Sequence, residues 1–176
     1  MRDPLAALRC WPIHVELAGE EYTIPAVPAR AWFLSILGGE PLPIIPGMLD
    51  PDDAERLSDR IVDGEVSLRE LTLASRDALE LASGWRWWEA DRLIRSAGAQ
   101  WKVVGGELAL AGVDLDAQPL GAVLNTLYVL AARSLNEQQR QQLDFQISAP
   151  PPELEEEERE ALAEEMFEAL LADAGR

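Results

Sequence analysis

The stretch Ser67–Gly98, "SLRELTLASRDALELASGWRWWEADRLIRSAG", predicts two consecutive helices around which the rest of the chain is arranged. Ser67 and Glu70 form an S-x-x-E capping box, whose two side chains bind free backbone N–H groups at the start of a helix. Apolar residues then recur at helical spacing until Ser83–Gly84 interrupts the pattern. A tryptophan-rich helix follows, and Gly98 is expected to end it.

Outward from this pair, helix caps and apolar spacing predict four further helices. Asp50 and Pro51 give a strong helix start, because aspartate accepts hydrogen bonds at the cap and proline suits the first helical position. Asp116 and Asn136 are expected to cap two later helices. The expected helices lie near residues 28–37, 51–63, 68–82, 85–97, 117–135 and 137–146.

Two short segments predict β-hairpins. In residues 12–24, "PIHVELAGEEYTI", apolar and polar residues alternate on both sides of Ala18–Gly19. In Trp101–Leu110, "WKVVGGELAL", the pair Gly105–Gly106 suits the positive φ angles of a two-residue turn. The expected fold class is therefore mainly α with small β-hairpins (α+β).

The composition changes sharply at the end of the chain. Residues 1–149 are expected to form one domain, the N-terminal hairpin plus a compact helical core. Residues 150–176 hold ten acidic and two basic residues behind a proline run. Leu162, Met166 and Leu170 still recur there at helical spacing. We therefore expect a proline linker and a separate, acidic amphipathic C-terminal helix.

The overall charge restricts the classes of partner. Fifteen Lys and Arg face 32 Asp and Glu, which gives a net charge of −17. Such a charge keeps a protein soluble and repels phosphate backbones and anionic membrane surfaces. No run of apolar residues approaches the length of a membrane span. We expect neither a nucleic acid nor a membrane as partner.

The residues that carry most enzyme chemistry are scarce. Cys10 and His14 are the only soft or nitrogen ligands for a transition metal, and Pro12 lies between them. Phosphate-binding glycine motifs are absent from the sequence. His14 is expected on the exposed face of a strand, which argues against a catalytic base. The sequence thus predicts no catalytic residue, no metal and no cofactor.

Three of the six tryptophans lie within four residues, at positions 85, 87 and 88. One helix face buries one or two indoles, so three spread around a helix need surroundings on several sides or some exposure. Either the helix lies in the core, or Trp85 or Trp88 anchors a partner, as exposed tryptophans often do. The stripe Leu162, Met166 and Leu170 is a second candidate contact, because an unpaired amphipathic helix commonly docks in a groove.

The order of elements and two short motifs carry a family resemblance. The hairpin runs into "YTIPAVPARAWFLSIL", with a Y-x-I-P motif, and W-x-W-W-x-A-x-R-L begins at Trp85. An acidic helix is expected at the end of the chain. Together these features resemble tail assembly chaperones of long-tailed phages that infect actinobacteria. The likeness covers most of the first 135 residues.

The resemblance implies a function without catalysis. Members of that family coat the tape measure protein and keep it soluble until tail-tube subunits polymerise around it. This chain would then bind the tape measure protein through Trp85, Trp88, Leu162, Met166 and Leu170, with the tail-tube protein and its own copies as possible further partners. It would act in the host cytoplasm and be missing from the mature virion.

Two other functions also fit these sequence features. An adaptor or other structural protein of the head–tail junction would also be acidic, helical and without a cofactor. A small hydrolase with a site around His14 is the third reading. The content of purified particles separates the first two, and activity screening with a His14→Ala control tests the third.

Overall fold

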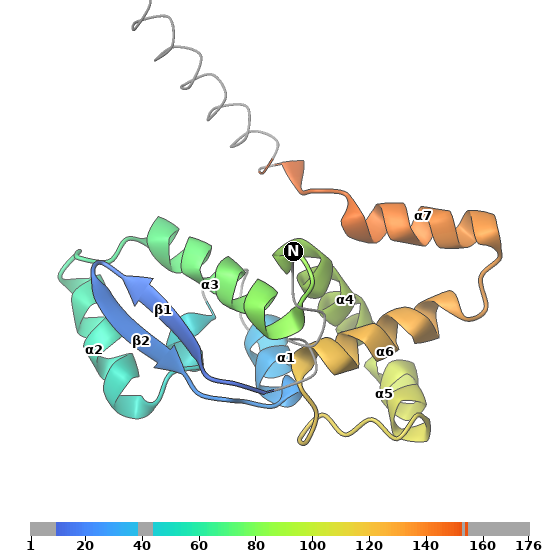
Figure 1. Cartoon of the computed structure of the whole chain (residues 1–176), viewed down its shortest axis with the longest axis horizontal. Helices are drawn as coiled ribbons and strands as arrows, with labels where there is room; N and C mark the ends of the chain where they lie inside the picture. Colours follow the sequence, from blue (N-terminus) through green and yellow to red (C-terminus); the bar gives the residue numbers. More distant parts are fainter. Residues whose placement is uncertain (1–9, 39–43, 153, 155–176) are drawn as a thin grey trace, which may run out of the picture.

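The computed structural model describes residues 10–38, 44–152 and 154. It confirms the expected class, a mainly helical fold with a small antiparallel hairpin at the N-terminal end (Figure 1). The elements are β1 (Ile13–Leu17), β2 (Glu20–Ile24), α1 (Ala29–Gly38), the 3-10 helix η2 (Ile45–Gly47), α2 (Pro51–Val62), α3 (Leu68–Ser83), α4 (Trp87–Ala99), α5 (Trp101–Leu110), α6 (Leu120–Ala132) and α7 (Glu137–Ser148).

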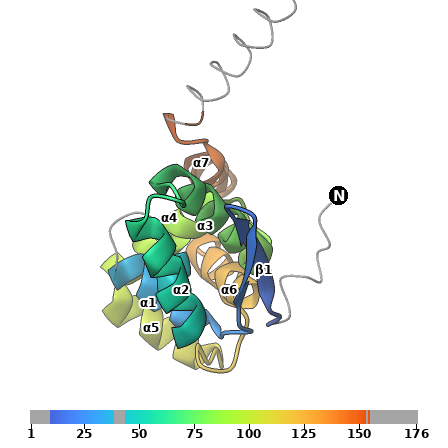
Figure 2. The ribbon, with the colours of Figure 1, turned by 90° about the vertical axis from the view of Figure 1, so that its left-hand side faces the viewer.

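The hairpin follows its sequence pattern. Val15 pairs with Tyr22 across the strands, and both side chains are buried, whereas His14 is exposed. Ala18 and Gly19 both have positive φ angles, 48° and 80°, as a two-residue hairpin turn requires. The inner face of β1 packs on α3 (Figure 2). The hairpin therefore closes one side of the helical core.

The predicted caps of three helices are confirmed. The carboxylate of Asp50 accepts hydrogen bonds from the backbone N–H groups of Asp52 and Asp53, at 3.1 and 3.0 Å. Ser67 and Glu70 form a complete capping box, and hydrogen bonds from Ser67 lower the pKa of Glu70. A second capping box, formed by Asn136 and Gln139, starts α7. These starts come from local sequence alone, since each cap lies within three residues of the groups it satisfies.

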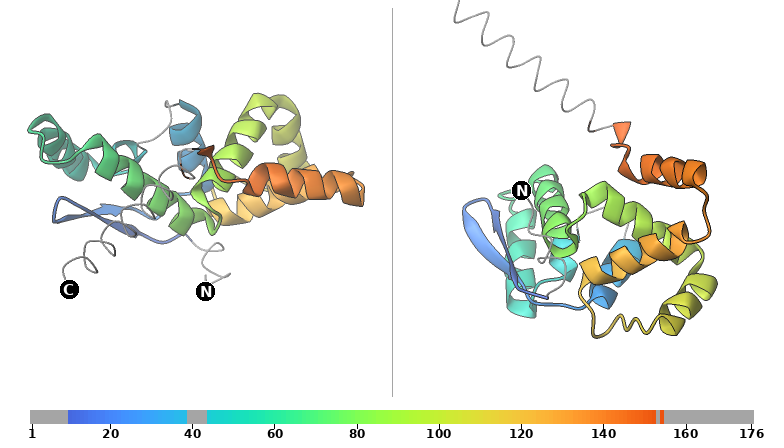
Figure 3. Two further views of the ribbon diagram at one scale, coloured as in Figure 1. Left: turned by 90° about the horizontal axis from the view of Figure 1, so that it is seen from above. Right: turned by 45° about the vertical axis from the view of Figure 1, so that its right-hand side comes forward.

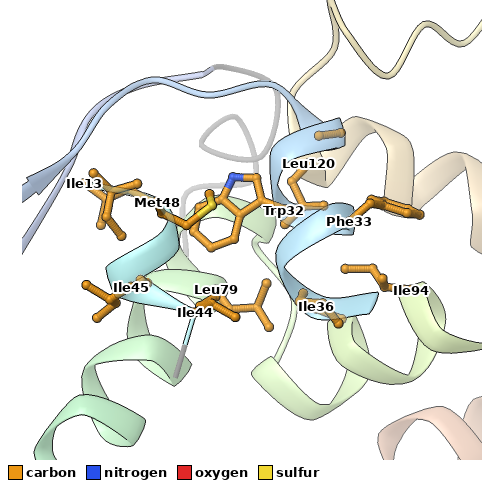
Figure 4. Close-up of a cluster of buried hydrophobic side chains, with 14 of the residues drawn as sticks. Ile13, Trp32, Phe33, Ile36, Ile44, Ile45, Met48, Leu79, Ile94 and Leu120 are labelled. Atoms are coloured by element: carbon orange, nitrogen blue, oxygen red, sulfur yellow. The ribbon is translucent and has the colours of Figure 1, made fainter. Parts of the chain in front are cut away.

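The core lies between α1, α3, α4 and α6, where α1 and α3 both pack against α4 and α6 (Figure 4). Trp32, Phe33 and Ile36 of α1 are 2–3% exposed. Leu79 of α3 and Ile94 of α4 are fully buried in the same cluster. Helix α4, which packs against α1, α3, α5, α6 and α7, is the central element, and α2 and α5 lie toward opposite ends of the molecule (Figure 1).

The second predicted hairpin is wrong, because residues 101–110 form helix α5. Gly105 and Gly106 have no positive φ, so they make no hairpin turn. The segment places Trp101, Val104 and Leu108 at helical spacing toward the core. The Trp101 ring lies so near Gly105 that a Cβ there would be 3.3 Å from it. Packing on this face outweighs the turn preference of two glycines.

Helix α4 differs from its predicted bounds at both ends. It begins at Trp87 and not at residue 85, because Arg86 has the extended backbone of a cap. It passes through Gly98 and ends at Ala99, so Gly98 does not stop it. A Cβ at Gly98 would lie 2.6 Å from a methyl group of Leu37. This glycine therefore allows α1 and α4 to approach closely.

Helix α6 is shorter than the predicted 117–135. Pro119 precedes its first residue as the cap, and the helix ends at Ala132. Asp116, the predicted cap, instead pairs with Arg30 at 2.7 Å. In the described ranges, no helix is long and apolar enough to cross a membrane. The predicted acidic helix at 150–176 lies almost wholly outside the described residues.

Candidate partner-binding surfaces

Trp85, in the connection between α3 and α4, packs against α6. Its indole N–H donates a 3.0 Å hydrogen bond to Oδ1 of Asn125, and its ring centroid lies 5.7 Å from that of Tyr128. The Tyr128 hydroxyl in turn donates to Asp144 of α7 at 2.6 Å, which raises the pKa of Tyr128. Because the ring is partly buried against the core and its donor is used, this indole already serves the fold.

Trp88 and Arg92 hold the end of α7 against α4. The Trp88 indole donates a 3.2 Å hydrogen bond to the carbonyl oxygen of Ser148. One guanidinium nitrogen of Arg92 donates to the carbonyl oxygens of Gln146, Ile147 and Ala149. Carbonyl groups in the last turn of a helix lack partners within the helix, so these donors cap α7 and fix its end.

Trp87 lies beside a hollow between α3 and α4. Its ring meets that of Trp88 edge to face, with centroids 5.8 Å apart, and the Arg76 guanidinium lies 4.3 Å from its centroid. Burial, together with the neighbouring Glu80 carboxylate, raises the pKa of Asp77. This α3–α4 hollow of about 330 Å³ is lined by Leu73, Arg76, Asp77, Glu80, Arg86, Trp87, Trp88 and Leu154.

Helix α5 is apolar on its outer surface as well as its inner one. Between Trp101 and Val113 only Lys102 and Glu107 are charged, in a chain that is 27% charged. Leu110 is 87% exposed and Val103 is 65% exposed. A helix that is apolar all round is normally buried on all sides. The outward side chains of α5 are therefore unusual for a surface helix.

A groove of about 260 Å³ lies between α4, α5 and α6, and we call it the α5 groove. Figure 3 shows α6 between α5 and α7, and α7 packs against α4. Glu107 and Arg133 line the groove and form an ion pair, 2.7 Å apart, so their charges compensate each other. Its apolar lining consists of Leu93, Ala97, Val103, Val104, Leu127, Leu130 and Ala131.

A second apolar surface lies where α5 meets α1. The Trp101 ring contacts that of Phe33, with centroids 6.1 Å apart, yet Trp101 remains 42% exposed. On α1, Leu34 is 65% exposed and Leu37 is 43% exposed. Apolar side chains thus reach the surface near α5 from two elements, and such gatherings mark binding surfaces more often than scattered residues do.

The residues considered for chemistry lie apart from these surfaces. His14 is exposed, and its Nδ1 lies 2.8 Å from a Glu21 carboxylate oxygen and 3.1 Å from the Thr23 hydroxyl. Cys10 is exposed and unpaired. Across residues 10–38, 44–152 and 154, no three His, Cys, Asp or Glu side chains gather as metal ligands would.

Two of the five residues predicted to contact a partner lie in the described part of the chain. Trp85 and Trp88 have partners inside the chain, and their role toward another protein stays a prediction. Leu162, Met166 and Leu170 lie outside the described residues. Sequence reasoning misses the surface of α5, because Gly105–Gly106 predicts a hairpin turn there. The shortage of charge between residues 101 and 113 was the available signal.

Three comparisons, with models of protein families, with curated proteins and with solved structures, find nothing that matches this chain.

Proposed function

We propose that this protein is a phage tail assembly chaperone, which binds the tape measure protein and keeps it soluble during tail assembly. The observation that carries the proposal is the outer surface of α5 with its groove. It presents apolar side chains on a chain of net charge −17. The family resemblance of the first 135 residues supplies the identity of the client.

The make-up of α5 favours binding of a partner helix. An isolated helix of this length is marginal in water, and each interior glycine costs about 1 kcal/mol relative to alanine. Leu110 and Val103 add apolar area that gains about 25 cal/mol per Å² when water is removed. A second helix laid in the α5 groove would bury Val103, which lines it, and one that also covers the outer surface of α5 would bury Leu110.

The charges of the groove suit an apolar client. Glu107 and Arg133 pair with each other, so a helix entering the groove meets no uncompensated charge. The chain as a whole carries 17 more acidic than basic residues. Many copies bound along one client would therefore repel one another and keep the complex soluble. A tape measure protein, with long apolar helix faces before assembly, is a client of this kind.

Co-expression with the tape measure protein of the same phage tests the proposal. The wild-type chain should keep the tape measure protein in the soluble fraction and co-purify with it. The double variant Val103→Glu and Leu110→Glu should lose both effects, because it places charge on the outer surface of α5. Val62→Glu is the matched control, since Val62 is as exposed as Leu110, at 85% against 87%, but lies on α2.

Two results would contradict the proposal. If the wild-type chain leaves the tape measure protein insoluble, the chaperone function is wrong. If the double variant and the Val62→Glu control both retain binding, the α5 surface is not the site. Circular dichroism of each variant shows whether the helical fold is kept.

The content of purified phage particles separates a chaperone from a structural protein. A chaperone is expected to be absent by mass spectrometry, because it leaves before the tail is complete. A fixed copy number per particle would favour an adaptor of the head–tail junction instead.

A further inference from the structure

The α3–α4 hollow has an apolar and aromatic centre with charges around it. Leu73 is 43% exposed there, beside the two adjoining rings of Trp87 and Trp88. Arg76 and Arg86 lie over these rings, 4.3 and 5.6 Å from the centroids. A hollow of this kind fits apolar side chains that are flanked by carboxylates, which guanidinium groups bind.

The chain itself leads into this hollow. Trp88 and Arg92 fix the end of α7 by hydrogen bonds to the carbonyl groups of Ser148 and Ala149. Beyond them, the backbone N–H of Leu154 donates to the carbonyl oxygen of Pro151 at 3.0 Å. Leu154 then lines the hollow. The described part of the chain therefore ends at the hollow.

The sequence that follows has the matching chemistry. Residues 155–176 number 22 (176 − 154) and contain nine acidic residues and two arginines. Leu162, Met166 and Leu170 recur at the spacing of one helix face. A segment tethered beside its site has an effective concentration near the millimolar range, so weak contacts are enough for docking.

Apolar contact, and not net charge, would hold the segment. Asp77 and Glu80 also line the hollow, so its two arginines are balanced by two acids. A further carboxylate near Asp77 would be unfavourable, because burial and Glu80 already disfavour its charged form. The carboxylates of the segment are thus expected toward Arg76 and Arg86, with the apolar stripe against Leu73 and the indoles.

We propose that residues 155–176 fold back on their own chain and dock in the α3–α4 hollow through the stripe Leu162, Met166 and Leu170. The docked segment covers the exposed parts of Trp87 and Trp88. It leaves the α5 groove open, because the hollow and the groove share no residue. This inference does not depend on the proposed function.

Paramagnetic broadening in the full-length protein tests the docking. Cys10 is first replaced by serine, and a nitroxide is attached through Met166→Cys. When the label and the isotope-labelled amides are on the same chain, the signals of Leu73, Arg76 and Trp87 should lose intensity. When the label is on a different chain of a mixed sample, these signals should keep their intensity.

Two outcomes would overturn the proposal. Unchanged signals in both samples would mean that the segment does not dock there, and losses in the mixed sample as well would mean that it docks on a second copy. Leu73→Glu should abolish the intensity loss at Arg76 and Trp87, whereas Val62→Glu on α2 should keep it. Because the protein is measured alone, failure here leaves the binding of a tape measure protein untouched.

Discussion

The tryptophan-rich start of α4 and helix α5 use large apolar residues in opposite ways. Near α4, the indoles of Trp85 and Trp88 donate hydrogen bonds to Asn125 and Ser148 inside the chain. On α5, Val103 and Leu110 lie mostly in water. The clustered tryptophans, which are conspicuous in the sequence, thus stabilise the fold. The exposed apolar surface belongs instead to α5, whose sequence has no such cluster. Large side chains indicate a binding surface only when the fold leaves them unburied.

The largest difference between the two regions is expected in stability. Trp85→Ala removes a partly buried ring and leaves Asn125 without the donor of its hydrogen bond. It should therefore lower the free energy of unfolding by about 2 kcal/mol, roughly half the loss expected for a fully buried tryptophan. Leu110→Ala should change it by less than about 0.5 kcal/mol. Urea denaturation measures both. Equal losses would mean that α5 is as much a part of the core as Trp85.

The second largest effect on stability is expected where α7 is attached to α4. Arg92→Met removes the donor of three carbonyl groups and should cost about 1.5 kcal/mol, as for hydrogen bonds to a charged group. Arg95→Met is the control, because Arg95 pairs with Asp91 on the same helix and such pairs contribute about 0.3–0.5 kcal/mol. Hydrogen exchange should accelerate in α7 for Arg92→Met alone. Acceleration in neither variant would contradict the role of Arg92.

Replacing each of the two glycines of α5 with alanine tests whether this segment is helical. Gly106→Ala should stabilise the protein by about 1 kcal/mol, since nothing lies within 4 Å of the added Cβ. Gly105→Ala should gain less, because its Cβ would lie 3.3 Å from the Trp101 ring. Thermal denaturation compares the two variants. In a hairpin with positive φ at these positions, both changes would destabilise the protein instead.

A smaller effect on stability, which depends on pH, is expected from Asp77 in the α3–α4 hollow. The raised pKa of Asp77 means that the folded state disfavours its charged form. This cost is absent below the unfolded pKa of about 3.9 and grows as the pH rises through the folded pKa. Asp77→Asn should therefore be more stable than the wild type at pH 7 and equal to it near pH 3. Urea denaturation at the two pH values measures the difference, and the opposite trend would show that Asp77 is stabilised as an anion.

Local signals in the sequence predicted much of the fold. The caps at Asp50, Ser67 and Asn136 and the alternation of the hairpin depend on groups a few residues apart, so they could be seen without a structure. Helix α5 could not be predicted this way, because the contacts of Trp101 with Phe33 join residues far apart in the chain. The role of Gly98 could not be predicted for the same reason, since it depends on the contact with Leu37.

The candidate surface was predicted less well than the fold. The sequence identified the indoles as notable but not their acceptors, Asn125 and Ser148, which lie 40 and 60 residues further along. Exposure of Val103 and Leu110 follows from which face of α5 meets the core. Such facts depend on the packing of several helices, and periodicity in one segment does not contain them.

Hydrogen exchange of the protein with and without the proposed client, a tape measure protein, tests the central claim most directly. Bound client should slow exchange in α5 and in the facing half of α6, residues 127–131, and should leave the start of α4 unchanged. Slower exchange around Trp85 and Trp88, with α5 unaffected, would contradict the assignment of the binding surface to α5.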